Sequence, residues 1–176
     1  MKNKATLKLI YAALCLALAQ VLPFVTMQIP TVGKMLSPMH IPVFLCGFLC
    51  GAPYAGVIGF IAPLMRSLLF GMPTLIPDAL SMAFELLAYG VITGLLNRYL
   101  PKKILYIYVT LLCAMLGGRI VWGISKFIIT HVIGMEFPFS AFIAGAFVNA
   151  VPGIILHIIL VPTIVIALRK AKLMPE

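Results

Sequence analysis

The sequence predicts an all-α integral membrane protein built from six transmembrane helices. Hydrophobic residues make up 63% of its 176 residues and charged residues only 10%, and the mean hydropathy is +1.16, so most of the surface must face lipid. A hydrocarbon core about 30 Å thick is crossed by roughly 20 helical residues, and the chain divides into apolar stretches of about that length. The period-two alternation of a closed β-barrel is absent from the sequence, which favours helices.

The boundaries of these helices follow from length and from helix-breaking residues. The basic and then apolar N-terminus resembles a signal peptide, but Gln20 and Pro23 stand where a small-residue cleavage site belongs, so we expect this helix to remain. Residues 40–70 are too many for one comfortable span, and the break at Gly51-Ala52-Pro53 divides them. The predicted helices, within a single domain of residues 1–176, cover residues 8–22, 40–50, 54–70, 79–99, 104–129 and 141–168.

Basic residues predict the orientation of the bundle. With six helices, the N-terminus, the turn after the fourth helix and the C-terminus share one side, and these three segments hold nine of the 13 Lys and Arg residues. The positive-inside rule therefore predicts that both termini are cytoplasmic. We interpret the net charge of +9 as a sign of topology, and we expect no nucleic-acid partner. The nine residues are Lys2, Lys4, Lys8, Arg98, Lys102, Lys103, Arg169, Lys170 and Lys172.

Polar residues in the outer half of the bundle predict a ligand site. Glu85 lies about 10 Å deep at roughly 1.5 Å per helical residue, and Arg119 and Asn149 lie at similar depth on two other helices. Charges at such depth cost several kcal/mol unless they face a bundle interior or a wet cavity. The same outer region holds Arg66 and His40, which we also count as candidate ligand residues.

Helical spacing groups these residues into two stripes. Spacings of three, seven and eleven residues from Asp78 place one set of polar residues on a single face of the fourth predicted helix. Spacings of three and seven residues from Arg119 place the other set on one face of the fifth predicted helix. Opposed stripes would line a cavity open to the outside, with an indole ring to stack on the ligand. The alternative is an ion pair between Glu85 and Arg119 that only holds the helices together. The stripes are Asp78, Ser81, Glu85 and Tyr89, and Arg119, Trp122 and Lys126.

Two outer loops suggest lids over a ligand site, and three small-residue motifs suggest surfaces where another helix packs closely. Residues 24–39 and 71–77 are rich in proline and apolar side chains, so they would close over a ligand or else pack on the rim of the bundle. The spacing small-x-x-x-small lets another helix approach closely. It occurs at Ala13 and Ala17, at Gly47 and Gly51, and at Gly90 and Gly94.

These features together resemble the S components of energy-coupling-factor (ECF) vitamin transporters, and most of all the branch that holds the pantothenate and riboflavin binders. The resemblance extends over nearly the whole chain and includes its size, its six helices and the alanine motif at Ala13 and Ala17. The segments that carry it most clearly are His40-Ile41-Pro42-Val43, Gly71-Met72-Pro73 and Gly145-Ala146-Phe147-Val148-Asn149-Ala150-Val151-Pro152-Gly153.

The resemblance implies a role and a set of partners. Ala13 and Ala17 would pack on the coupling helices of a transmembrane partner, two cytoplasmic ATPases would drive uptake, and the two outer loops would gate the ligand. The protein would then lie in the plasma membrane of a prokaryote. Pocket residues diverge strongly in that family, so the ligand is not implied.

Several absences in the sequence favour a binding subunit over an enzyme or a complete pump. The phosphate-binding pattern G-x-x-x-x-G-K-[ST] does not occur, so an ATPase must come from a partner. The cysteines show no C-x-x-C spacing, and we expect neither a metal site nor a cofactor. Asp78 and Glu85 are about 10 Å apart, too far to share a proton as a catalytic pair. A proton-coupled carrier or channel that uses Glu85, or a scaffold subunit without a ligand, remain alternatives.

The class of ligand stays open between two chemistries. The outer cations Arg66, Arg119 and Lys126 outnumber the acids Asp78 and Glu85, which favours a carboxylate such as pantothenate. A flat nitrogen heterocycle with donors for Glu85 fits nearly as well.

Overall fold

The computed structural model describes residues 4–26 and 35–174, and all its regular structure in this part of the chain is helical. Five helical segments are long and apolar enough to cross a membrane: Lys4–Val25, Ala52–Phe70, Leu75–Tyr99, Ile104–Val132 and Phe139–Lys170. The elements are α1 (Lys4–Val21), η1 (Leu22–Thr26), α3 (His40–Cys50), α4 (Ala52–Phe70), η2 (Leu75–Ala79), α5 (Leu80–Tyr99), α6 (Ile104–Val132), α7 (Phe139–Ile143), η3 (Ala144–Val148) and α8 (Val151–Lys170).

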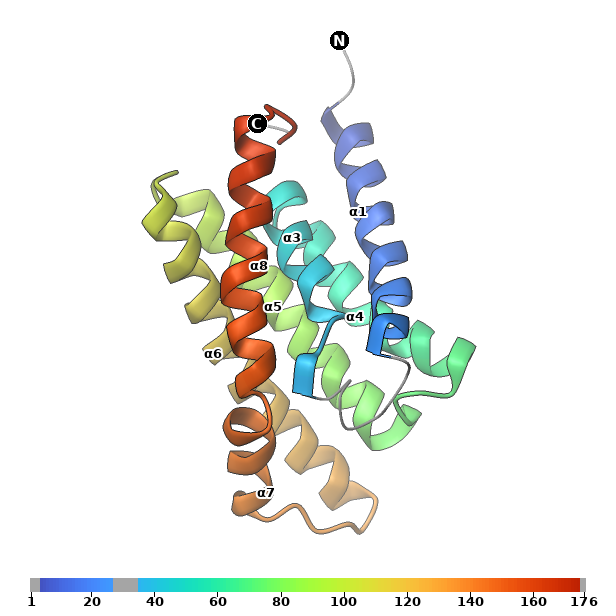
Figure 1. Ribbon diagram of the computed structural model, residues 1–176. Helices are drawn as coiled ribbons and strands as arrows, with labels where there is room; N and C mark the ends of the chain where they lie inside the picture. Colours follow the sequence, from blue (N-terminus) through green and yellow to red (C-terminus); the bar gives the residue numbers. More distant parts are fainter. Residues whose placement is uncertain (1–3, 27–34, 175–176) are drawn as a thin grey trace.

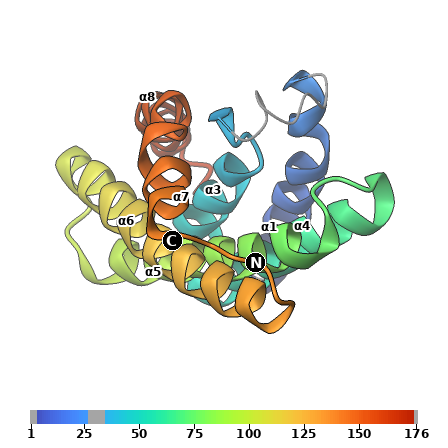
Figure 2. The ribbon, with the colours of Figure 1, turned by 90° about the horizontal axis from the view of Figure 1, so that it is seen from below.

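The short helix α3 forms the centre of the bundle. It packs against α1, α4, α5 and α8, and it runs between α1 and α8 in both views (Figures 1 and 2). Ten of its 11 residues are buried. At about 1.5 Å per residue it is only about 16 Å long, too short to cross the membrane alone. The structure therefore supports five candidate spans, and the sixth predicted span is this inner helix.

Both described ends of the chain lie at the same end of the bundle (Figure 1). The Tyr11 hydroxyl of α1 donates a hydrogen bond of 2.9 Å to the Leu173 carbonyl, and Arg169 of α8 donates one of 3.0 Å to the Lys102 carbonyl in the turn between α5 and α6. We call this the basic end. Because the termini share it, the chain passes along the bundle an even number of times, and α3 makes the sixth passage.

Gly51 separates α3 from α4. Its φ of +88° lies in a region that residues with a Cβ rarely adopt. Pro53 follows in the first turn of α4, where its missing N–H costs nothing. The break predicted at Gly51-Ala52-Pro53 is therefore present.

The glycines of α5 allow a close contact with α4. A Cβ added at Gly90 would lie 2.4 Å from the Ala55 carbonyl oxygen, and one at Gly94 would lie 2.1 Å from the Ala52 nitrogen. Both neighbours are backbone atoms of α4, which cannot move aside as a side chain could. The close approach predicted from the motif at Gly90 and Gly94 is confirmed.

The last predicted helix, over residues 141–168, lies within the candidate span Phe139–Lys170, but it is not one regular helix. The structure divides it into α7, η3 and α8. Pro152 lacks the N–H that would bond to the carbonyl four residues back, and its ring crowds that turn. Just before Pro152 the helical turn is wider than in an α-helix, because the Asn149 N–H bonds to the Ala144 carbonyl five residues earlier, at 2.8 Å. The chain has the same wider hydrogen bonding at η2, around Pro77, just before the fourth predicted helix.

Candidate functional site

Two ion pairs join the η2–α5 segment to α6 along one seam. Glu85 Oε1 lies 2.9 Å from Arg119 Nη1, and Asp78 pairs with Lys126. The two acids are seven residues apart along η2 and α5, and the two cations are seven residues apart on α6. Since seven residues complete about two turns of helix, the antiparallel helices bring both pairs onto facing surfaces. The two predicted stripes therefore face each other at these four residues.

Glu85 is the centre of a buried polar cluster. Its side chain is 2% exposed. Besides the Arg119 guanidinium, its Oε1 accepts a hydrogen bond of 2.7 Å from the Tyr89 hydroxyl, one turn further along α5. His40 Nε2, from the first residue of α3, lies 3.8 Å away. Three helices thus supply the groups that compensate one buried carboxylate, as a charge in this environment requires.

Aromatic rings form one wall of this cluster. The His40 ring stacks on the His157 ring of α8 with centroids 5.8 Å apart, and the Phe44 ring lies 4.8 Å from that of Tyr89. Phe44 is one turn after His40 on α3, so both face the same side of that helix. His40, Phe44, Tyr89 and His157 together present four rings next to one ion pair.

The segment before α3 closes the cluster on the side of α8. The Ser37 carbonyl lies 3.3 Å from His157 Nε2, and both Ser37 and Met39 are buried. A Cβ at Gly153 of α8 would lie 2.5 Å from the Met35 carbonyl oxygen. These contacts hold residues 35–39 against α8 and over the cluster. The rest of the predicted lid, residues 27–34 with Gly33 and Lys34, lies outside the described residues.

Three nitrogen atoms of the cluster have no hydrogen-bond partner in the described structure. They are both ring nitrogens of His40 and Nε of Arg119. A buried donor or acceptor without a partner costs about 1–3 kcal/mol. The cluster therefore has unused hydrogen-bonding capacity beside the Glu85 carboxylate, where a ligand with polar edges would gain by binding.

Arg66 lies elsewhere, at the interface of α1 and α4. Its guanidinium donates a hydrogen bond of 2.8 Å to the Gln20 carbonyl and lies 5.1 Å from the ring centroids of both Phe24 and Phe70. Gln20 is in the last turn of α1, where unpaired carbonyls and the helix dipole attract cations. The described contacts of Arg66 therefore stabilise the end of α1 and do not reach the Glu85 cluster.

The other members of the two stripes have mainly structural contacts. The Ser81 hydroxyl bonds to the Pro77 carbonyl at 2.8 Å within its own helix start. The Trp122 ring stacks on Phe142 of α7 at 6.2 Å and fits over Gly145, where a Cβ would lie 2.8 Å from the ring. Trp122 thus packs α6 against the α7 region. Its predicted contact with a ligand, like that of Ser81, stays a prediction.

Asn149 is not brought to the cluster. It follows η3, just before α8, and its side chain is exposed. The hydrogen bond that the structure gives it is the backbone one to Ala144. Its predicted contact with the ligand also stays a prediction.

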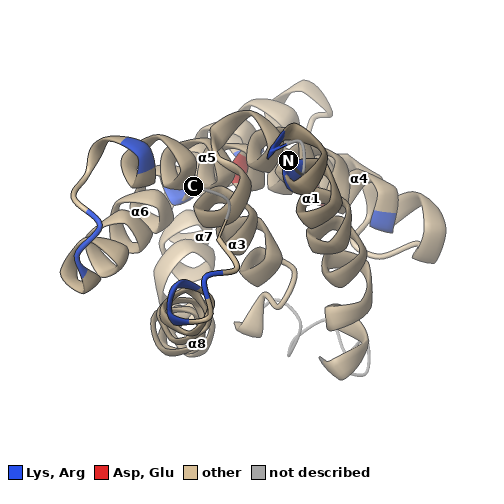
Figure 3. Cartoon of the chain, turned by 90° about the horizontal axis from the view of Figure 1, so that it is seen from above, with Lys and Arg blue, Asp and Glu red and all other residues tan. Residues whose placement is uncertain are grey.

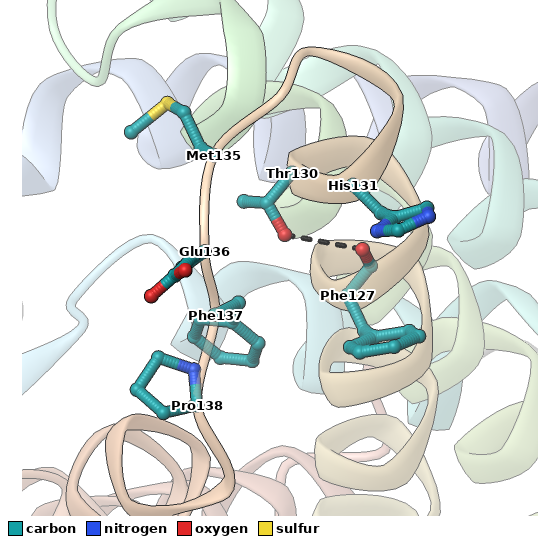
Figure 4. Close-up of a pocket in the computed structure, with 7 residues that line it drawn as sticks. All are labelled: Phe127, Thr130, His131, Met135, Glu136, Phe137 and Pro138. Atoms are coloured by element: carbon teal, nitrogen blue, oxygen red, sulfur yellow. Dashed lines mark hydrogen bonds between the residues drawn. The ribbon is translucent and has the colours of Figure 1, made fainter.

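A separate hollow of about 290 Å³ lies between the end of α6 and the loop to α7 (Figure 4). Thr130 and His131 border it on the helix, and Glu136 and Phe137 on the loop. The Glu136 carboxylate points away from the helix in this view. No residue of the Glu85 cluster lines this hollow, so the two are distinct places.

Ala13 and Ala17 lie on an exposed strip of α1. Both are exposed, as are Leu14 and Leu18 beside them, whereas Ala12 and Cys15 face the core. The motif therefore lies on the outside of the bundle, where a second protein has access to it.

Three further residues at the cluster, Phe44, His157 and Ser37, were not predicted from the sequence. His157 is an ionisable residue inside a membrane helix, which is itself a signal of function. Phe44 is four residues after His40 and shares its face. Ser37 carries no sequence signal, because its backbone carbonyl makes the contact.

The fold and the cluster define a multi-pass membrane protein with a polar site buried inside a helical bundle. A family model described as "ECF transporter, substrate-specific component" matches residues 7–165. The chain therefore belongs to this family, and it is the substrate-specific subunit of an ECF transporter, a transport component and not an enzyme. The comparisons found no match among curated proteins or among solved structures.

Proposed function

We propose that this subunit captures a small water-soluble vitamin or related micronutrient from outside a prokaryotic cell and delivers it through an ATP-driven module. The module comprises a transmembrane coupling protein and two cytoplasmic ATPases. Both termini, and with them the basic end, are cytoplasmic in this proposal. The ligand binds in the Glu85 cluster, with Glu85, Arg119, Tyr89 and His40 as the polar contacts and Phe44 and His157 as stacking neighbours.

The observation that carries this proposal is the set of unpartnered nitrogens in the cluster. A bundle held together only by the Glu85–Arg119 pair has no need to bury His40 without hydrogen bonds, at a cost of about 1–3 kcal/mol for each unpaired group. A ligand whose polar edges pair with these nitrogens removes this cost on binding. The cost of the empty site thus supports a binding role.

The balance of charge in the structure favours a ligand without a net negative charge. The three outer cations that suggested a carboxylate are engaged: Arg119 by Glu85, Lys126 by Asp78, and Arg66 by a helix end and two rings. A carboxylate would have to compete with Glu85 for Arg119 in a site that is almost closed to water. Of the two ligand chemistries that the sequence left open, pantothenate or a flat heteroaromatic vitamin, we therefore prefer the second.

Entry and delivery are assigned to different parts of the protein. Residues 35–39, which cover the cluster and bond to His157 through Ser37, would move aside to admit the ligand, together with residues 71–77. The exposed strip at Ala13 and Ala17 would dock on the coupling protein.

The direct experiment is mass spectrometry of small molecules released from the purified protein. We expect one heteroaromatic compound in amounts close to that of the protein, and much less from Arg119→Met and His40→Phe variants that remain folded. An empty but folded wild-type protein would favour the scaffold alternative. Uptake into vesicles that contain this chain but no ATPase would favour the proton-coupled carrier.

A further inference from the structure

The basic end carries a concentration of positive charge that the proposed function does not use. Cations from α1, from the turn between α5 and α6 and from the end of α8 lie at this end, and Figure 3 shows the last two groups in blue. The acids of the described structure lie elsewhere: Asp78 and Glu85 are in η2 and α5, and Glu136 is in the loop before α7. Among the described residues, no carboxylate balances this end.

Two of these cations are held together around one side chain. Arg169 Nη2 lies 3.3 Å from Asn97 Oδ1, and Lys102 Nζ lies 3.4 Å from the same oxygen. Arg169 also donates to the Lys102 carbonyl, and Lys102 to the Asn97 carbonyl. Partial burial and the nearby Arg169 guanidinium lower the pKa of the Lys102 ammonium, so the two like charges disfavour each other where they stand.

The ends of α5 and α8 offset only part of this charge, because Arg169 lies in the last turn of α8. A helix C-terminus is equivalent to about half a negative elementary charge, whereas Lys102 and Arg169 carry one positive charge each. Within the described residues, about one positive charge therefore remains uncompensated. Both side chains also keep N–H groups that make no bond in the described structure, since an ammonium has three donors and a guanidinium five.

The surroundings of this pair indicate a lipid. Tyr99, Ile104 and Leu105, on both sides of the turn, are 74%, 57% and 67% exposed. Large apolar side chains beside a membrane helix end face acyl chains, and tyrosine is typical of the interface between acyl chains and headgroups. An anion that reaches Lys102 from this side arrives with its hydrocarbon chains against these residues.

We propose that Lys102 and Arg169, held by Asn97, bind the phosphate of an anionic phospholipid in the leaflet at the basic end. The chemistry is that of basic pockets between transmembrane helices, which take lipid headgroups through charge-assisted hydrogen bonds. The lipid would bridge the α5–α6 turn and the end of α8, two segments that are distant in sequence.

Native mass spectrometry of the delipidated full-length protein tests this proposal. Phosphatidylglycerol and phosphatidylcholine with identical acyl chains are titrated separately. We expect phosphatidylglycerol to bind at least about tenfold more tightly. A basic residue near an anionic headgroup contributes about 1 kcal/mol, so Lys102→Gln and Arg169→Gln should each weaken it about fivefold. Lys102→Arg should bind as the wild type does.

Lys103→Gln is the matched control, because Lys103 is the next residue, is exposed, and has no described bond to Asn97. We expect less than a twofold change. Equal losses in the Lys102 and Lys103 variants would reduce the site to a diffuse charge effect and overturn the proposal. Equal affinity for the two lipids, or displacement of phosphatidylglycerol by millimolar inorganic phosphate, would also overturn it. If Arg169→Gln proves unstable, the affinity of Lys102→Gln for phosphatidylglycerol, compared with that of Lys103→Gln, decides the proposal by itself.

Discussion

Removal of Arg119 is the perturbation that best separates a ligand site from a structural ion pair. The Glu85 side chain is 2% exposed in the structure, with His40 Nε2 at 3.8 Å. Arg119→Met would leave its carboxylate only the Tyr89 hydroxyl as a hydrogen-bond donor. Loss of one partner of a buried pair costs about 3–5 kcal/mol. Tyr89 and His40 still interact with the carboxylate, so we expect the lower value, about 3 kcal/mol, which is over a hundredfold in the folding equilibrium.

The double variant Glu85→Gln with Arg119→Met removes both charges. Since no uncompensated charge remains, we expect it to recover most of the stability lost by the single variant. Ligand affinity should not recover, because the hydrogen bonds to the ligand are still missing. Each lost contact should weaken binding by about 1–3 kcal/mol, or about ten- to a hundredfold.

The assays are thermal unfolding of the empty protein in detergent and titration with the ligand that co-purifies. The Asp78→Asn, Lys126→Met pair on the same seam is the matched control. The Asp78 side chain is 32% exposed and the Lys126 side chain 11%, so this pair is less buried than Glu85–Arg119 and its removal should cost less stability. A Glu85/Arg119 double variant that regains both stability and wild-type affinity would refute the assignment of the ligand site.

Three further predictions concern other parts of the bundle. Gly94→Ala should destabilise the protein by about 1–3 kcal/mol because its Cβ would meet the α4 backbone at 2.1 Å. Gly117→Ala should cost less, because its Cβ would meet only the end of the Ile92 side chain. Equal melting temperatures of the two variants would contradict the packing argument. Arg66→Met should lower the melting temperature through loss of its bond to Gln20 and its two ring contacts. Ligand affinity should stay within about twofold of the wild type. A large loss of ligand affinity would instead place Arg66 at the ligand. Ala17→Trp should abolish uptake by the complete transporter and leave ligand binding by the isolated subunit intact, since the bulky ring would lie on the exposed strip of α1. Normal uptake with the complex assembled would show that this strip does not dock on the coupling protein.

Hydrophobicity and periodicity predicted the helical membrane fold well, because both depend on local sequence. The break at Gly51 and the close packing at Gly90 and Gly94 follow from backbone rules that hold in any helix bundle. The length of α3 was also visible in the sequence. Its place at the centre was not, because that depends on which helices pack around it.

The polar seam between α5 and α6 was predictable for a similar reason. Glu85, Tyr89 and Arg119 lie at helical spacing on adjacent helices, so their stripes had to face inward. His157 and Asn149 show the limit of such reasoning. Depth along a helix indicates the level of a residue in the membrane, but its direction depends on rotation of the helix. The turn around Asn149, widened before Pro152, changes that rotation just where α8 begins.

The cations required the structure for their interpretation. A count of charges in the outer half suggested an anionic ligand, since a count treats every cation as available. The structure engages Arg66 with the end of α1, and Lys126 with Asp78. Partners of this kind come from distant parts of the chain, and no spacing in the sequence indicates them.

The most direct test of the binding site is to compare the co-purified ligand in wild-type protein and in Tyr89→Phe. This change removes only the hydroxyl that bonds to Glu85 at 2.7 Å and keeps the ring that packs on Phe44. We expect quantitative mass spectrometry to show a heteroaromatic ligand at close to one per wild-type protein and a several-fold lower occupancy in the folded variant at limiting ligand. Equal occupancy in the two proteins, together with equal occupancy in Arg119→Met, would contradict a ligand site at Glu85.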